Sequence, residues 1–155
     1  MNELAVCIDK IAPMSISEID RVREFEAVIL TLPQAELPTT QLLHAGMYAR
    51  TMFVRAGVTV VGAFMQCATI LIISGDMKVY IGAETVEFHG YNIIPASAGR
   101  KQAGYAITDT YVTMLFPTEA KTIEEAEEEF TDEADKLITR NGGTNQITVL
   151  CVSLI

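Results

Sequence analysis

The chain has 155 residues, half of them hydrophobic, and 20 acidic side chains against 11 basic ones give it a formal net charge of −9. This length suits one domain with a single core, and the charge argues against nucleic acid as a partner, because phosphate binding depends on clustered Lys and Arg. The apolar runs stay below the ~18 residues that span a bilayer, and the N-terminus carries acids where a signal peptide is basic. We therefore expect one untargeted, cytosolic domain without a membrane partner.

The N-terminal part predicts an arm, a helix and a connector. Residues 1–14 have no clear hydrophobic period. A helix is indicated from Ser15, because Ser15 and Glu18 can form a capping box and apolar residues then recur on one face. It should end just before Pro33, since proline disfavours helical geometry in the residue before it. Residues 33–40 (PQAELPTT) are then expected to be an extended connector.

The central part of the chain predicts a mainly β structure. Stretches rich in β-branched and aromatic residues alternate with turns about every eight to twelve residues, a spacing typical of a β-sandwich or barrel. The predicted strands are 47–54, 58–64, 67–74, 77–81, 85–88, 92–95, 102–107 and 110–116.

A second, acidic helix is predicted after these strands. Thr122 and Glu125 can form its capping box, and an apolar stripe follows at helical spacing. The stripe consists of Ile123, Ala126, Phe130, Ala134 and Leu137. The other positions are mostly acidic, and two interpretations stay open: a solvated face that adds solubility, or a docking surface for a basic partner.

The chain ends in an apolar strand behind a flexible break at residues 140–143 (RNGG). Residues 147–155 (ITVLCVSLI) are apolar on both faces, so this strand has to be covered. It either completes the sheet of its own domain or adds to a neighbouring subunit or another protein. In the second case the interface would consist of Ile147, Val149, Leu150, Cys151, Val152, Leu154 and Ile155.

Several motifs in a fixed order resemble the small cupins often encoded by bacteriophages and prophages. They are LPQAELP, HAGMYARTMFVRAGVTVVG, ILIISGDMKVYIG and IIPASAGRKQAGYAITDTYVTMLFPT, followed by the acidic helix. The resemblance covers residues 32–137 and implies a mainly β, cupin-type jelly-roll barrel or sandwich with an N-terminal helix, a C-terminal acidic helix and a terminal strand. We divide the chain into an N-terminal arm (1–14), a cupin-like domain with its flanking helices (15–138) and a glycine-hinged C-terminal strand extension (139–155).

The resemblance implies a metal site for which this sequence lacks ligands. Cupins place an H-x-H pair a short fixed distance after a glycine, because alternate residues of a strand point the same way and two imidazoles can share one ion. Here Gly57 matches the glycine, but the two histidine positions fall on Ala63 and Met65. The later strand offers only Met114 and Phe116. We therefore expect neither a metal nor another cofactor.

Neither the histidines nor the cysteines indicate a catalytic site. His44 and His89 look like strand-end or loop positions, and Cys7, Cys67 and Cys151 are far apart, without a CxxC pair. The sequence contains no G-x-S-x-G motif and no phosphate-cradling glycine loop. No catalytic residue is predicted, and the chain is expected not to be an enzyme.

A pocket in the barrel interior is a further candidate site. If Arg50 faces the interior, it needs a carboxylate partner or an anionic ligand, whereas facing outward it is an ordinary surface residue. Met65 and Cys67 could share a face, either to hold a soft ion or as apolar core. The candidate pocket consists of Tyr48, Arg50, Met65, Cys67, Tyr111 and Met114.

Together these observations favour a non-catalytic cupin-fold interaction module. The resemblance suggests a phage or prophage structural (virion-associated) or accessory protein that acts through protein–protein contacts and self-assembly. Its expected partners are further copies of itself, as a homo-oligomer, and other phage structural proteins. Its expected location is the host cytoplasm, with incorporation into the virion left open. The alternatives are a metal-dependent cupin enzyme acting on a small molecule and a small-ligand-binding barrel.

Overall fold

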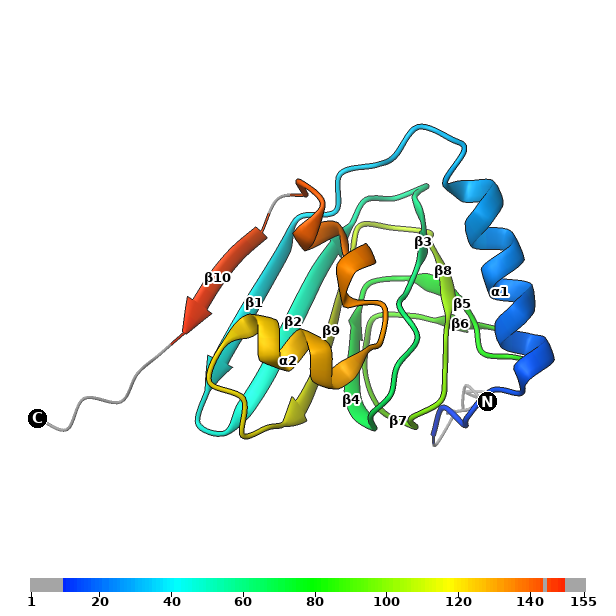
Figure 1. Ribbon diagram of the computed structural model, residues 1–155. Helices are drawn as coiled ribbons and strands as arrows, with labels where there is room; N and C mark the ends of the chain where they lie inside the picture. The colour runs from blue at the N-terminus through cyan, green and yellow to red at the C-terminus, as the bar shows by residue number, and fades with distance from the viewer. Residues whose placement is uncertain (1–9, 144, 150–155) are drawn as a thin grey trace, which may run out of the picture.

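Two β-sheets and two helices make up the computed structural model, which describes residues 10–143 and 145–149 (Figure 1). The six-stranded sheet has the order β10-β1-β2-β9-β4-β7, and the four-stranded sheet has the order β3-β8-β5-β6. The strands of the first sheet are β1 (Thr39–His44), β2 (Met47–Val54), β4 (Thr69–Ser74), β7 (Tyr91–Ala96), β9 (Thr110–Pro117) and β10 (Asn145–Val149). Those of the second are β3 (Thr59–Val61), β5 (Met77–Tyr80), β6 (Thr85–Phe88) and β8 (Ala103–Ala106). The prediction of a mainly β, two-sheet fold is confirmed.

Alternating side chains give each sheet one face toward the core. In β4, for example, Leu71 and Ile73 are buried, whereas Ile70, which points to the opposite face of the strand, is exposed. The core forms between the two sheets, where side chains such as Val79 of β5 and Ile94 of β7 join them. Apolar burial of this kind contributes about 25 cal/mol per Å² of surface removed from water, so the inward faces hold the sandwich together.

One strand was not predicted. Strand β1 (Thr39–His44) begins inside the stretch that the sequence suggested was a connector. Its inward positions include Thr39 and Gln41, which are almost fully buried although both are polar. The strand therefore alternates correctly in burial but not in hydrophobicity, and hydrophobic patterning alone cannot detect it.

Helix α1 (Ile16–Ile29) forms as the sequence predicts. The Ser15 backbone N–H donates to Glu18 Oε1 at 2.9 Å, and the Glu18 N–H donates to Ser15 Oγ at 3.2 Å, which completes the capping box. The helix lies along the four-stranded sheet (Figure 1), where Val22 belongs to a small apolar cluster that includes Val61 and Tyr80.

Helix α2 (Ile123–Phe130) is shorter than predicted. Thr131 adopts an extended conformation (φ −150°, ψ 147°), and two 3-10 turns, η1 (Ala134–Lys136) and η2 (Ile138–Arg140), follow in place of a continuous helix. The Thr131 hydroxyl accepts from the Glu133 N–H at 3.1 Å, a local bond that competes with helix continuation. All five residues of the predicted apolar stripe are nevertheless buried.

Both ends of the described chain pair with the six-stranded sheet. Ile11, within the predicted N-terminal arm, is fully buried and forms a bridge with Ala96 of β7. At the opposite edge, β10 runs parallel to β1, with Asn145 opposite Thr39 and Val149 opposite Leu43. Of the two alternatives for the C-terminal strand, the structure shows pairing within the chain.

The predicted interface at the C-terminus is only partly described. Ile147 and Val149 are part of β10. The other predicted contact residues, Leu150, Cys151, Val152, Leu154 and Ile155, lie outside the described residues. No helix in the described part of the chain is both long and apolar enough to cross a membrane.

Candidate functional site: the barrel interior

Strand β2 directs two polar side chains into the interior. Tyr48 lies opposite Phe116 and Arg50 lies opposite Met114 in the register of β2 with β9. Tyr48 is fully buried, and only 12% of the Arg50 side chain is exposed. Of the two alternatives for Arg50, the structure therefore shows the inward one.

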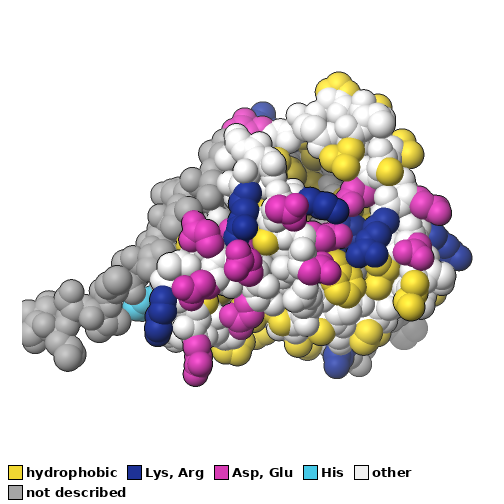
Figure 2. Space-filling model, in the orientation of Figure 1, with side chains coloured by type: hydrophobic (Ala, Val, Ile, Leu, Met, Phe, Trp, Pro, Cys, Tyr) yellow, Lys and Arg dark blue, Asp and Glu magenta, His cyan; other side chains and the backbone are white. Residues whose placement is uncertain are grey.

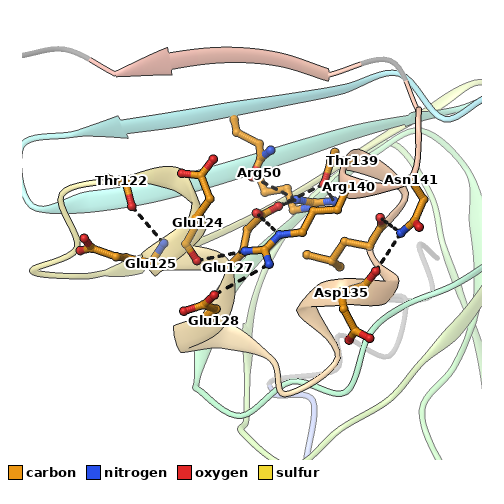
Figure 3. Close-up of polar contacts among 12 residues, drawn as sticks. Arg50, Thr122, Glu124, Glu125, Glu127, Glu128, Asp135, Thr139, Arg140 and Asn141 are labelled. Carbon is orange, nitrogen blue, oxygen red and sulfur yellow. Dashed lines mark hydrogen bonds and ion pairs between the residues drawn. The ribbon is translucent and has the colours of Figure 1, made fainter.

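The partner of Arg50 is a carboxylate from helix α2. Arg50 Nη1 lies 3.3 Å from Glu127 Oε2, and Arg50 Nη2 donates to Thr139 Oγ1 at 3.2 Å. Figure 3 shows a second arginine, Arg140, reaching the same carboxylate from the other side, with Nε 2.9 Å from Oε1. One acid thus joins strand β2, helix α2 and the η2 turn.

Glu127 is the residue of this buried network that the sequence interpretation did not identify. It is 2% exposed, whereas its neighbour Glu128 keeps 66% of its side chain in solvent. The solvated-face interpretation of the acidic helix therefore holds for Glu128 and is wrong for Glu127. A signal was present, because Glu127 lies four residues after Ile123 and three before Phe130, on the same helix face as the apolar stripe.

Aromatic rings fill the space next to this ion pair. The centroid of the Tyr48 ring lies 5.3 Å from that of Phe116 and 5.8 Å from that of Phe130. The Tyr48 hydroxyl donates to Gln41 Oε1 at 2.5 Å. Gln41 also accepts from Arg50 Nη1 at 3.1 Å. Burial raises the pKa of Tyr48 to about 12, with Arg50 acting in the opposite direction. The phenol is therefore a neutral, structural hydrogen-bond donor at physiological pH.

The segment GRKQAG at residues 99–104 buries two basic side chains, Arg100 and Lys101. Lys101 is fully buried, and its Nζ lies 2.9 Å from Glu26 Oε2 and 3.0 Å from Glu133 Oε2. Burial would raise the pKa of Glu133, but hydrogen bonds from the Phe64 N–H and Lys101 hold it below its usual value. This second cluster ties α1 to the segment after α2.

Arg100 is buried near Cys67, the one cysteine of the predicted pocket. Its guanidinium donates to the Ser97 carbonyl at 2.6 Å and to Thr69 Oγ1 at 2.7 Å. Burial lowers the pKa of Arg100 to about 10. Burial also raises the pKa of the Cys67 thiol, with Arg100 opposing it, so this cysteine is protonated at neutral pH.

The structure brings together most, but not all, of the predicted pocket residues. Met114 is buried with Tyr48, and Met65 and Cys67 are half-buried and pack against the same core. Tyr111 is 54% exposed, so its placement in the barrel interior is wrong. The reason is the two-residue period of a strand, which puts Tyr111 and Met114 on opposite faces of β9.

The interior does not fit a divalent metal. Ala63 and Met65 offer no nitrogen or oxygen ligand, and Arg50 places a fixed positive charge opposite Met114, where the later ligand is expected. Within residues 10–143 and 145–149, no group of three or more His, Cys, Asp and Glu side chains could hold an ion. His44 and His89 are both exposed, and His89 pairs with Asp76 at 3.4 Å.

Two open depressions mark the surface. One, of about 540 Å³, is lined by the turn at Gly46 and by Thr118 and Glu129. The other, of about 330 Å³, lies between α1 and the four-stranded sheet beside Phe25 and Tyr80. Neither is lined by the side chains of the predicted interior pocket.

No family model matches the chain, and no curated protein is significantly similar to it in sequence. Among solved structures, it is similar to ectoine synthase from P. lautus (16% identity, 63% of this chain and 75% of that chain, TM-score 0.48). It is also similar to KdgF from Halomonas sp. (14% identity, covering 56% of this chain and 84% of that chain, TM-score 0.47). A third similar structure is a cupin superfamily protein from Desulfitobacterium hafniense (9% identity, covering 57% of this chain and 83% of that chain, TM-score 0.46). At such identities and TM-scores these likenesses carry no argument about activity or ligands. By its own topology, the described part of the chain is a mainly β sandwich of two sheets with two helices.

Proposed function

We propose that the chain is a non-catalytic interaction module that acts through protein–protein contacts and assembles with further copies of itself. The observation that carries this proposal is the filled interior, where Arg50 and Glu127 neutralise each other and Tyr48 packs against aromatic rings. Groups committed to one another in this way are not free to bind or activate a small substrate. The interior therefore serves as a scaffold.

The exposed apolar surface supports the same proposal. Ile93 is 61% exposed and Tyr91 is 65% exposed, and both lie on strand β7 of the six-stranded sheet. Scattered apolar residues are normal on a protein surface, but neighbouring ones on a single rigid sheet are typical of contact sites. The apolar C-terminal residues 150–155 are a second proposed contact region.

The proposal extends to a phage or prophage assembly, in which the chain would be a virion-associated structural protein or an accessory protein. Its support is the sequence resemblance, which runs from LPQAELP to the acidic helix. Jelly rolls suit such assemblies because rigid sheets position loops and surfaces for contacts. The proposed partners are then other structural proteins of the particle, met in the host cytoplasm or in the virion.

Metal analysis combined with sedimentation of the purified full-length protein tests the proposal. We expect substoichiometric Fe, Mn, Ni and Zn, together with self-association that increases with protein concentration. The Glu127→Gln variant serves as a matched probe, because it alters the interior without changing an exposed side chain. A monomer that retains one equivalent of metal through dialysis, and loses it in this variant, would overturn the proposal in favour of a metal-dependent enzyme.

A further inference from the structure

The outer face of the six-stranded sheet carries no charged side chain. We define this outer face as the side chains of β1, β2, β9, β4 and β7 that point away from the four-stranded sheet. The strand registers align them in rows, such as the row that joins Thr40, Thr51, Thr113, Ile72 and Ile93. None of the 20 acidic and 11 basic residues of the chain lies at one of these positions.

Neither helix covers this face. Helix α1 packs on the four-stranded sheet, and helix α2 packs through Phe130 on Tyr48 and Phe116, which point to the opposite side (Figure 1). The outer face consequently leaves large apolar side chains in solvent. They are Leu42, Ile70, Tyr91, Ile93 and Tyr111, which are between 41% and 65% exposed.

Two contacts order side chains of this face before any partner arrives. The ring centroids of Phe53 and Tyr111 lie 4.9 Å apart. The hydroxyls of Thr51 and Thr113 form a hydrogen bond of 2.7 Å between β2 and β9. Side chains that are already ordered lose little conformational entropy on association. A preorganised surface of this kind suits a partner surface that is also ordered before association.

Charge decides which partner fits. The chain carries a net charge of −9, and eight of its acids lie between residues 124 and 135, away from the outer face. Two copies that met through charged surfaces would bring acid against acid, whereas two outer faces meet without any like-charge pair. A membrane with anionic lipids would repel the same acidic protein.

The area of the outer face is close to what a dimer requires. Five strands about 4.8 Å apart and about 20 Å long cover roughly 500 Å² in projection, and the accessible surface of protruding side chains is larger. Stable contacts bury about 800 Å² on each partner. The outer face must therefore be used almost whole, and one added charge should disrupt it.

We infer that two copies of the chain pair through this outer face in an isologous contact, an assignment that rests on the proposed function and names its surface. Under two-fold symmetry each residue of the face is used twice. A charge placed there is therefore desolvated in both copies. The outcome is a dimer with its acidic α2 sides facing away from the contact.

Sedimentation of full-length wild type, Ile93→Glu and Val28→Glu tests this inference. Ile93 and Val28 have nearly equal exposure, 61% and 60%, but Val28 lies on α1, away from the outer face. We expect a wild-type dimer whose Kd rises about 100-fold in Ile93→Glu and stays within about twofold in Val28→Glu. Thermal unfolding of each variant under monomeric conditions checks that the fold is kept.

Further variants distinguish an isologous outer-face contact from other modes of association. Ile93→Lys should weaken the dimer as Ile93→Glu does, and stronger association would instead reveal an acidic partner surface and overturn the isologous contact. If Leu154→Glu abolishes self-association and Ile93→Glu does not, the contact is C-terminal: the interaction module stands and the outer-face assignment fails. A wild type that stays monomeric also overturns the outer-face assignment. So does a wild type that sediments with phosphatidylcholine vesicles, if the Ile93→Glu variant does not.

Discussion

The two faces of the six-stranded sheet handle charge in opposite ways. The inner face buries Arg50 against Glu127 beneath α2, while the outer face shows apolar side chains to solvent and has no charge at all. Figure 2 views the molecule from the α2 side, where acidic side chains gather with a few basic ones among them. The inner face is thus filled by its own side chains, and the outer face leaves apolar side chains in solvent.

This difference between the inner and outer faces indicates what a substitution on each face should change. A buried ion pair pays a desolvation cost on both partners, so replacing it with apolar groups is often neutral, whereas removing one partner is strongly destabilising. Glu127 holds strand β2 and the η2 turn together through Arg50 and Arg140. The inner face should therefore respond to substitution in stability, and the outer face in association.

Removal of the buried carboxylate should have the largest effect on stability. Glu127→Ala removes the carboxylate partner of Arg50 and leaves Arg140 only the longer contact, 3.8 Å, with the exposed Glu128, so we expect a loss of about 3–5 kcal/mol in the free energy of unfolding. Urea denaturation measures it. The matched control, Glu128→Ala, removes an exposed acid from the same helix and should change stability by less than about 0.5 kcal/mol. Equal losses in the two variants would show that the Glu127 network contributes nothing beyond a surface pair.

A pair of tyrosines compares the two faces directly. Tyr48→Phe removes the hydroxyl that donates to Gln41, and we expect a loss of about 1 kcal/mol in the free energy of unfolding. Tyr111→Phe removes a hydroxyl from the outer face, and its effect on monomer stability should lie within about 0.5 kcal/mol. Urea denaturation of both variants at low protein concentration measures the difference. A larger loss in Tyr111→Phe would reverse the comparison.

The smallest expected effect is a pH dependence at the second buried cluster. The pKa of Glu133 is lowered in the folded chain, so the native state binds fewer protons than the unfolded state just below the ordinary carboxyl pKa of about 4.3. Its stabilisation is complete above that value and is lost as the pH falls through the lowered pKa.

Acid titration of stability checks this sign. Unfolding free energies from pH 7 downward should fall less steeply in Glu133→Gln than in wild type. The exposed Glu124→Gln is the matched control and should follow the wild-type curve. If Glu133→Gln follows it as well, the Lys101 contact does not stabilise the ionised carboxylate.

Much of the fold could be predicted from local patterns. The bounds predicted for the strands at 47–54 and 85–88 agree with β2 and β6, and the Ser15 capping box forms as expected. Such features depend on neighbours in sequence, where alternation and side-chain caps act over a few residues. Strand β1 was missed because its buried Gln41 is polar.

The candidate site could be predicted only in part. An inward Arg50 with a need for a carboxylate was one of two alternatives, and the partner, Glu127, lies 77 residues away in the sequence. The misplacement of Tyr111 was avoidable, because counting in twos along β9 separates it from Met114. Glu127 could also have been recognised from its position on the apolar stripe of α2.

The sequence by itself determined the strand pattern, the two helix starts, the acidic charge and the lack of metal ligands at Ala63 and Met65. Only the tertiary structure decided that Arg50 meets Glu127, that β10 lies on β1, and that one uncharged sheet face is left without a helix. The physical reason is that alternation makes each strand two-sided, while the packing of distant elements decides which side becomes core and which becomes surface.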